Sequence, residues 1–374
     1  MTISKGFLVK IGIKKSSIWG TAIDVNAADQ GLPILSETLS AASNLLTDES
    51  LTGTADQDTG VTSSQIVAGT IEANLQYSSP VLSLLIAMAM GRADTPAVPL
   101  GLGAEKPYPY YGSFRLGDNL EGYFVSLSID KQAGGVIHEY DSVKVNGFTI
   151  TGAAGSFVTI SFDLIARRLK TSGTTTTSLS AATVSVPKAF IRFEDFQFRS
   201  KAQSGVALNG DDQFYPTSFT LTLGNNLVGD MTSLNAPYVD EPIRDAARTV
   251  EGSFEIPKYE DTSRETQFLD GSVLKLDARA RSSSQIIAPG GGPYYYEFSM
   301  YCPSIQISDA QRPISGFSKV PAPFSFVAKR IDSAPEGMSG GGSLDTLNND
   351  ESRGSITESL KIEIMNVEKD NPLS

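Results

Sequence analysis

The sequence has little of the chemistry that enzymes and metal proteins use: its 374 residues include one cysteine, Cys302, and one histidine, His138. A single cysteine cannot form a disulfide within the chain, which fits a reducing compartment. A single histidine excludes metal sites built on histidine pairs. We expect Cys302 to be a buried strand residue and His138 to be an ordinary surface residue at a strand edge.

Long apolar runs are missing as well. The longest, Pro80 to Met90, is far short of the roughly 20 residues that cross a bilayer. The N-terminal stretch MTISKGFLVKIGIKKSS lacks the apolar core and cleavage site of a signal peptide. The glycine runs 290–292 and 340–342 lack the Lys-Ser/Thr pair of a phosphate-binding loop. We therefore expect a soluble protein made in the cytoplasm, with no membrane contact, no cofactor, no metal and no enzymatic activity.

Charge is sparse and mostly negative. Charged residues make up 19 % of the chain and the formal net charge is −12. This balance argues against a surface built to grip nucleic acid, because phosphate binding needs clustered lysine and arginine. Short β-compatible runs, broken by Gly, Pro, Asn and Asp, indicate a mainly β protein with long polar loops between strands.

The most informative feature is an internal repeat, visible in three pairs of blocks in the same order. A shift of 183 residues, from 67 to 250, relates VAGTIE to VEGSFE. A shift of 162, from 142 to 304, relates SVKVN to SIQIS and also FDLIARR (162–168) to FSFVAKR (324–330). A shift of 171, from 191 to 362, relates IRFED to IEIMN. The repeat predicts two domains, residues 1–200 and 201–374.

Most of these blocks alternate apolar and polar residues, the pattern of strands with one buried face. Between them, Ser79 to Gly91 predicts a buried helix, with Ser79 as its cap and Pro80 at its first position. Residues 261–269 predict a shorter helix at the matching place in the second copy. The sequence therefore predicts a mainly β (α+β) fold of two tandem sandwich or barrel domains, each flanked by a short helix.

A long segment lies at the same place in each copy, Leu39 to Ser64 and Asn225 to Arg248. Loops of this length without structure of their own are usually functional. Both carry scattered apolar residues, so we expect them to become ordered on a partner. These residues are Leu45, Leu46 and Leu51 in the first segment, and Leu227, Met231, Leu234 and Tyr238 in the second. The basic pairs at 167–168 and 329–330 end equivalent strands and suit a subunit interface or a loop contact.

The succession ETLS…TDESLTG, followed by VAGTIEANLQYSSPVLSLLIAMAMG, resembles the tail tube proteins of long-tailed, siphovirus-like bacteriophages. In that family a loop leads into a strand of the pattern V-x-G-x-I/L-x-x-x-L and then into an apolar helix ending in glycine. Val67, Gly69, Ile71 and Leu75 match the strand here. The second copy keeps the first three of these positions, at 250, 252 and 254, but its helix is more polar.

The resemblance implies a structural protein of the virion tail whose main partner is itself. Family members form rings of about six units around a channel, and the rings stack through long loops or hairpins. Two units fused in one chain imply a trimeric, pseudo-hexameric ring. Phage DNA would pass along the channel and the tape-measure protein would occupy it, without specific binding. Glu72 and Asp163, on the outward faces of two strands, are the candidate channel-facing residues.

Two other interpretations stay open at this point. A tandem β-sandwich adhesin or carbohydrate-binding module would present an exposed aromatic platform, for which the tyrosines at 108, 110 and 111 or at 294–296 are the candidates. Another virion component, such as a decoration or baseplate protein, would share the same composition.

Overall fold

A computed structural model describes residues 8–46, 60–98, 109–131, 135–183, 189–230, 238–257, 262–286, 294–310, 322–338 and 355–374. The fold is mainly β, as the sequence predicts. Eighteen strands join in one hydrogen-bonded network, and β14 (Leu227–Val228) and β15 (Ile243–Arg244) form a separate pair. Over the described residues the network stays open and does not close into a barrel.

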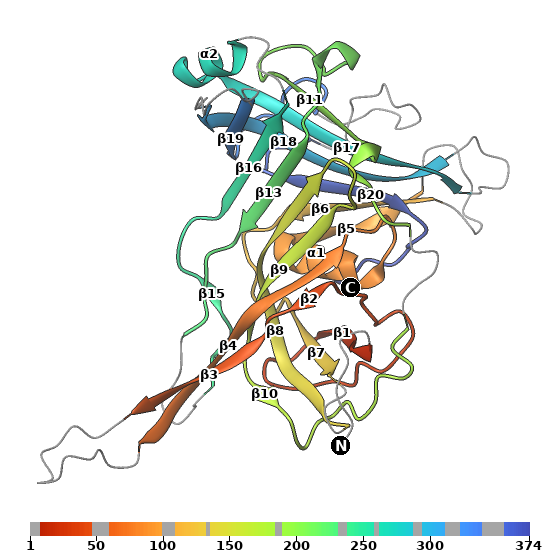
Figure 1. The fold of residues 1–374 in the computed structure, drawn as a ribbon, viewed down its shortest axis with the longest axis vertical. Helices are drawn as coiled ribbons and strands as arrows, with labels where there is room; N and C mark the ends of the chain where they lie inside the picture. Colours follow the sequence, from red (N-terminus) through yellow and green to blue (C-terminus); the bar gives the residue numbers. More distant parts are fainter. Residues whose placement is uncertain are drawn as a thin grey trace, which may run out of the picture.

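Twelve elements of the N-terminal and central region come first in the chain (Figure 1). They are β1 (Lys10–Ser16), β2 (Ser36–Glu37), β3 (Ser40–Leu46), β4 (Val61–Asn74), α1 (Pro80–Met90), β5 (Gly91–Ala97), β6 (Tyr110–Leu116), β7 (Phe124–Asp130), β8 (Ile137–Ala153), β9 (Thr159–Ala166), β10 (Leu169–Lys170) and a 3-10 turn (Phe193–Asp195). Before β14 come β11 (Phe196–Ala202), a 3-10 turn (Gly210–Asp212), β12 (Gln213–Phe214) and β13 (Ser218–Gly224). After β15 follow β16 (Thr249–Ile256), α2 (Ser263–Leu269), β17 (Val273–Ile286), β18 (Tyr294–Asp309), β19 (Ala322–Ala328) and β20 (Lys361–Asn366).

Helix α1 forms where the sequence predicts it. The side chain of Ser79 accepts a hydrogen bond from the backbone N–H of Leu82, and Pro80 occupies the first turn. Gly91 ends the helix with φ of 82°, a conformation that favours glycine, and its N–H bonds to the carbonyl of Ala87. Residues 81–90 are all buried, so the helix packs inside the molecule rather than on its surface.

The two halves of the chain share one strand order. In the first half the neighbours run β1-β7-β8-β9-β4-β2, and in the second half β11-β17-β18-β19-β16-β13. Every pair in both series is antiparallel, and α1 and α2 follow the corresponding strands β4 and β16. Strands β5 and β6 occur only in the first half, where the sequence of the first copy is longer.

The strand registers also correspond. Val143 lies opposite Ala166 in β8 and β9, and Ile305 lies opposite Ala328 in β18 and β19, which is the same pair after the shift of 162. In both strand pairs the regular register is interrupted two residues further along, after Val145 and after Ile307. An irregularity reproduced at the same position shows that the two hairpins share more than a general β pattern.

The third pair of sequence blocks is not equivalent in the structure, so that part of the repeat was aligned wrongly. Residues 361–366 form β20, which pairs with β6 and β18. Residues 193–195 instead form a 3-10 turn, because the carboxylate of Asp195 accepts the backbone N–H of Arg192 and closes the chain into a tight turn. Ile191 is held beside Leu75 and Val158 by backbone hydrogen bonds.

A continuous seam joins the halves. Strand β13 pairs with the C-terminal part of β8 over seven residue pairs, from Ser218 opposite Ala153 to Gly224 opposite Gly147. Strand β20 pairs with β6, so the C-terminal segment also returns to the first half. The expected domain boundary, between residues 200 and 201, falls within β11, whose partners β12 and β17 both lie in the second half.

The two long segments are not simple loops. Residues 40–46 and 61–66 extend the sheet as the β3–β4 hairpin, which projects from the body at the lower left of Figure 1. Residues 47–59 at its end lie outside the described part of the chain. The second segment contains the short pair β14 and β15 and lies along the body. A sequence such as SAASNLL has no clear alternation, which is why the first strand of the hairpin was not predicted.

Candidate functional site

The β3–β4 hairpin exposes apolar side chains. Leu45 and Leu46 are each 57 % exposed and Val61 is 68 % exposed. The described side chains of β3 are all exposed, so no described part of the chain covers this strand. A two-stranded ribbon standing alone in water is marginally stable at best. The hairpin therefore has the properties of a segment that another molecule covers. Leu51, which was predicted to act with these residues, lies outside the described residues.

The corresponding segment of the second half behaves differently, because it packs on the first half of the same chain. Leu227 is buried, and the ring of Tyr238 lies 5.1 Å and 5.0 Å from the guanidinium carbons of Arg167 and Arg168. The other two apolar residues predicted to act here, Met231 and Leu234, lie outside the described residues. The described parts of this segment, 225–230 and 238–248, thus pack on their own chain.

Polar contacts fix this packing along its length. The indole nitrogen of Trp19 donates to the carbonyl oxygen of Val239 at 3.2 Å. Glu241 pairs with the ammonium group of Lys144, which is 2 % exposed, and also accepts the backbone N–H of Gly122 at 2.7 Å. Burial lowers the pKa of Lys144, and the carboxylate of Glu241 offsets that effect in part. The ion pair lets a buried lysine keep its charge.

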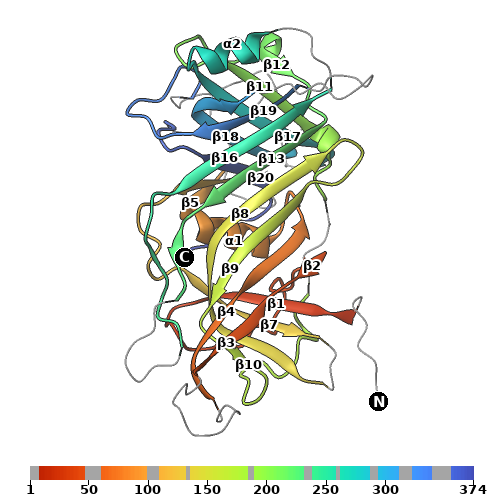
Figure 2. The same ribbon diagram turned by 60° about the vertical axis from the view of Figure 1, so that its left-hand side comes forward.

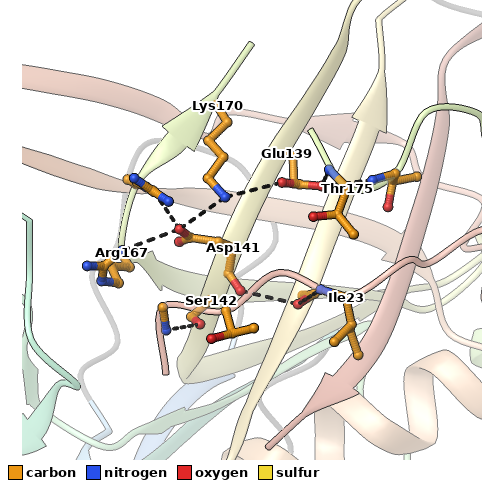
Figure 3. A network of polar contacts seen from close by, with 12 residues as sticks. Ile23, Glu139, Asp141, Ser142, Arg167, Lys170 and Thr175 are labelled. Carbon is orange, nitrogen blue, oxygen red and sulfur yellow. Dashed lines mark hydrogen bonds and ion pairs between the residues drawn. The ribbon is translucent and has the colours of Figure 1, made fainter. Parts of the chain in front are cut away.

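A cluster of charges around Asp141 holds the basic pair Arg167 and Arg168 in place (Figure 3). The fully buried carboxylate of Asp141 contacts Arg167 at 3.3 Å, Arg168, and Lys170 at 3.7 Å. Burial opposes the charge on Arg168, but the hydrogen bond and the charge of Asp141, together with Tyr238, outweigh it, and the pKa of this guanidinium is raised. Figure 3 shows the cations converging on the carboxylate from the end of β9 and from β10. The 238–244 segment packs on this cluster through the ring of Tyr238.

One face of the sheet is polar across both halves. It spans β4, β9, β8, β13, β16 and β19, which lie side by side in that order in Figure 2. Its outward polar residues include Thr70, Glu72, Asn74, Thr149, Thr151, Thr159, Ser161, Asp163, Ser218, Thr220, Thr222, Glu251, Ser253, Glu255 and Ser325. This set, which we call the polar face, contains four carboxylates and no lysine or arginine. It carries negative charge on a surface of hydroxyl groups.

The structure brings the two predicted channel residues onto this face. Glu72 is half-buried and accepts a hydrogen bond from the hydroxyl of Ser36 at 3.1 Å. Asp163 is exposed and accepts one from the amide of Asn146 at 2.7 Å. The sequence analysis missed Glu251 and Glu255, although the shift of 183 carries Glu72 directly onto Glu255. Applying the repeat to the candidate residues themselves would have found that position.

Neither a metal-binding cluster nor an exposed thiol occurs among the described residues. None of them forms a group of three or more His, Cys, Asp or Glu side chains that could bind a metal. Cys302 is buried in β18, as predicted, and burial raises its pKa to about 12, so its thiol is inert. His138 is half-buried on β8, and burial together with the charge of Lys131 lowers its pKa. Among the described helices, none is long and apolar enough to span a membrane.

The aromatic platform expected of a carbohydrate-binding module is missing from the described part of the chain. Tyr111 and Tyr296 are buried in β6 and β18. Tyr110, Tyr294 and Tyr295 are half-buried. Tyr108 lies outside the described residues. The five described tyrosines contribute to the body of the fold rather than to an exposed binding surface.

The chain thus presents a projecting hairpin, a polar face with carboxylates and a seam that continues one sheet across two similar halves. The family model described as phage tail tube protein matches residues 6–328. No curated protein matches the sequence. Because the family match covers most of the chain and agrees with the sheet-rich fold, the chain belongs to the phage tail tube protein family, whose members are structural components of the virion tail.

Proposed function

We propose that three copies of this chain close into a ring of six similar units and that such rings stack into the tail tube. The observation that carries the proposal is the seam between β8 and β13. There the C-terminal part of β8, in the first half, pairs with β13, in the second half, in a continuous antiparallel sheet, and the same pairing would join one chain to the next. Units joined by the same contact at every step close into a ring when the rotation per step closes.

The ends of the sheet fit this scheme. On the first half, β2 and β3 pair with β4 on one side only. On the second half, β18 is the counterpart of β8, and its last residue, Asp309, corresponds to Gly147 at the seam. In the proposed ring, residues 36–41 of one chain would therefore add to the end of β18 in its neighbour. Pairing of this kind removes the open sheet edges that otherwise favour aggregation.

The division of the chain follows from the strand pairing. We place the first unit before β11 and the second from β11 onward, because β11 pairs with β17 as β1 pairs with β7. Each unit then contains the six strands of the shared order and one helix. The boundary lies a few residues before the position expected from the sequence.

The polar face would line the channel. Carboxylates without cations repel DNA phosphate, and hydroxyl groups hydrate the wall, so DNA could move past without binding. Glu72 and Glu255 would occupy equivalent positions in the two units, with Asp163 and Glu251 nearby. In a trimer this makes about twelve carboxylates per ring (three copies of four). The tape-measure protein would fill the same channel before DNA leaves the head.

Assembly of the purified chain tests this function. Sedimentation and electron microscopy should show trimers, rings and tubes as the concentration rises. Replacing Glu72, Glu251 and Glu255 by lysine should leave assembly intact and make the tubes retain DNA in a salt-dependent way. A matched control replaces the exposed Glu121, Asp211 and Asp270, which lie outside the polar face, by lysine. Equal DNA retention by both variants would argue against a channel-lining role for the polar face.

A further inference from the structure

The C-terminal strand lies outside the strand order that the two halves share. β20 lies between β18 of the second half and β6 of the first half, and it pairs with both. β6 belongs to the part that occurs only in the first half, and the family match ends at residue 328, before β20 begins. β20 and the residues after it are therefore an addition that bridges two units already complete in the shared order.

The strand fills its place through side chains on both of its faces. Leu360, Ile362 and Ile364 are buried in the same core as α1 and β6. On the opposite face, the ammonium group of Lys361 contacts the carboxylate of Glu363 at 2.5 Å, and both side chains are buried. Burial lowers the pKa of Lys361, and the charge of Glu363 offsets that effect in part. The strand thus brings a counter-charge for its own buried lysine.

The residues after β20 bind the start of α1. The side-chain amide of Asn366 donates to the carbonyl oxygen of Tyr77 at 3.3 Å. The carboxylate of Glu368 accepts hydrogen bonds from the hydroxyl groups of Ser78 at 3.0 Å and Ser83 at 2.9 Å. Helix α1 has no acidic residue in its own first turn. Glu368 therefore supplies the negative charge that the N-terminus of a helix favours.

Two further contacts hold the end of the chain on the first half. The side-chain amide of Asn371 donates to the carbonyl oxygen of Ala93 in β5 at 2.9 Å, and the ammonium group of Lys15 in β1 donates to the carbonyl oxygen of Leu373. Figures 1 and 2 both place the C-terminus close to α1. Residues 360–374, which we call the strap, therefore run from the sheet of the second half onto the first half.

The strap closes two strand edges. Without it, β6 would pair only with β5 among the described strands, and residues 297–301 of β18 would pair only with β17. Open edges of this kind add further strands and favour aggregation. The strap has the properties of an extended peptide bound by strand addition, because it combines backbone pairing along its length with side chains that bind fixed partners.

We propose that the strap binds its groove as a separable peptide, which opens and closes as one unit while the seam between β8 and β13 stays formed. The groove consists of the edges of β6 and β18, the start of α1 and the carbonyl group of Ala93. Closure joins the two halves a second time and covers both strand edges, which keeps unassembled chains from adding to one another there. The inference goes beyond the proposed function, because it concerns the single chain and is tested without assembly.

Hydrogen exchange of the native full-length chain, followed by mass spectrometry at low concentrations of urea, tests the separation. A unit that opens by itself exchanges its amide hydrogens without global unfolding, so the amides of β20 and β6 should exchange together and at least about tenfold faster than those of β13 at the seam. Equal exchange of all three strands at every urea concentration below the unfolding transition would overturn the proposal, because the strap would then open only when the whole chain unfolds.

Removing the carboxylate at the start of α1 should open the strap more often. Glu368→Ala takes the acceptor away from Ser78 and Ser83 and should speed the exchange of β20 by about tenfold or more, with β13 unchanged. The matched control, Asp370→Ala, removes an exposed carboxylate of the same segment and should change neither rate. Asn371→Ala, which loses one hydrogen bond, is a milder variant for use if Glu368→Ala does not fold. Equal acceleration of β13 would contradict a strap that opens alone.

A synthetic peptide of residues 359–374 tests the groove itself. Added to the Glu368→Ala chain, it should replace the weakened strap and slow the exchange of β6 as its concentration rises. The same peptide carrying Glu368→Ala should protect β6 about tenfold less effectively. No protection by the wild-type peptide would contradict a peptide-binding groove. Wild-type protein that forms no rings or tubes would instead count against the proposed function, so the two failures are distinguishable.

Discussion

Replacing Gly147 by alanine is expected to break the seam between the two halves. Gly147 lies opposite Gly224, at one end of the pairing between β8 and β13. A methyl group there would lie well within 3.0 Å of the carbonyl oxygen of Leu223 and 3.1 Å from its carbonyl carbon. Both atoms belong to the backbone, so the clash can be relieved only if β13 moves away from β8.

The size of the effect follows from that displacement. Forcing an extra carbon into a packed site costs about 1–3 kcal/mol. Moving the strand also weakens backbone hydrogen bonds near the end of the seam, each worth about 1 kcal/mol. We therefore expect Gly147→Ala to lower the free energy of unfolding by about 3–4 kcal/mol.

Unfolding in urea, followed by circular dichroism, measures this change. The control is Gly210→Ala, where a methyl group meets no atom within 4 Å and should change stability by less than about 0.5 kcal/mol. We also expect a second transition in the Gly147→Ala curve, as one half loses its contact with the other. An unfolding free energy within 0.5 kcal/mol of the wild type, from a single transition, would refute the close seam.

Three further predictions concern buried groups, and unfolding in urea measures each of them. Burial raises the pKa of Glu297 to about 7, above its unfolded value. The protonated carboxyl therefore contributes up to about 3 kcal/mol of stability below about pH 4.5, and this contribution is lost as the pH rises through 7. Glu297→Gln should unfold at a higher urea concentration than the wild type at pH 8 but not at pH 5. Leu85→Ala, in fully buried α1, should cost about 2–5 kcal/mol, whereas the half-buried Ile256→Ala should cost clearly less. Glu241→Gln leaves Lys144 buried without its counter-charge and should cost about 3 kcal/mol; a loss below 0.5 kcal/mol would contradict the packing of the 238–244 segment.

Local features of the fold could be predicted from the sequence. Helix α1 was found because a serine cap, a proline in the first turn and a closing glycine all agree with one apolar stretch. The alternation in β4 and β9 correctly placed Glu72 and Asp163 away from the core. The equivalence of 162–168 and 324–330 extends to the strand register, because corresponding residues of the two hairpins lie opposite each other. A buried face fixes the register, since a slip of one residue would turn the apolar side chains away from the core.

Long-range features could not be predicted. The seam joins residues about 70 positions apart, and no local pattern says which strand edge of one half meets the other. The block at 191–195 reads as a strand, but the carboxylate of Asp195 turns the chain there. The buried carboxylate of Asp141 was missed because a charged residue within a strand is normally taken as solvent-exposed, and its three cations come from residues 167–170.

The central claim is that two similar units in one chain place the polar face toward a channel, and a cryo-electron microscopy reconstruction of the assembled tubes tests it most directly. We expect rings of three chains that show six similar units, with Glu72 and Glu255 facing the axis. Tubes whose inner wall is formed by another surface, with the polar face on the outside, would contradict the account.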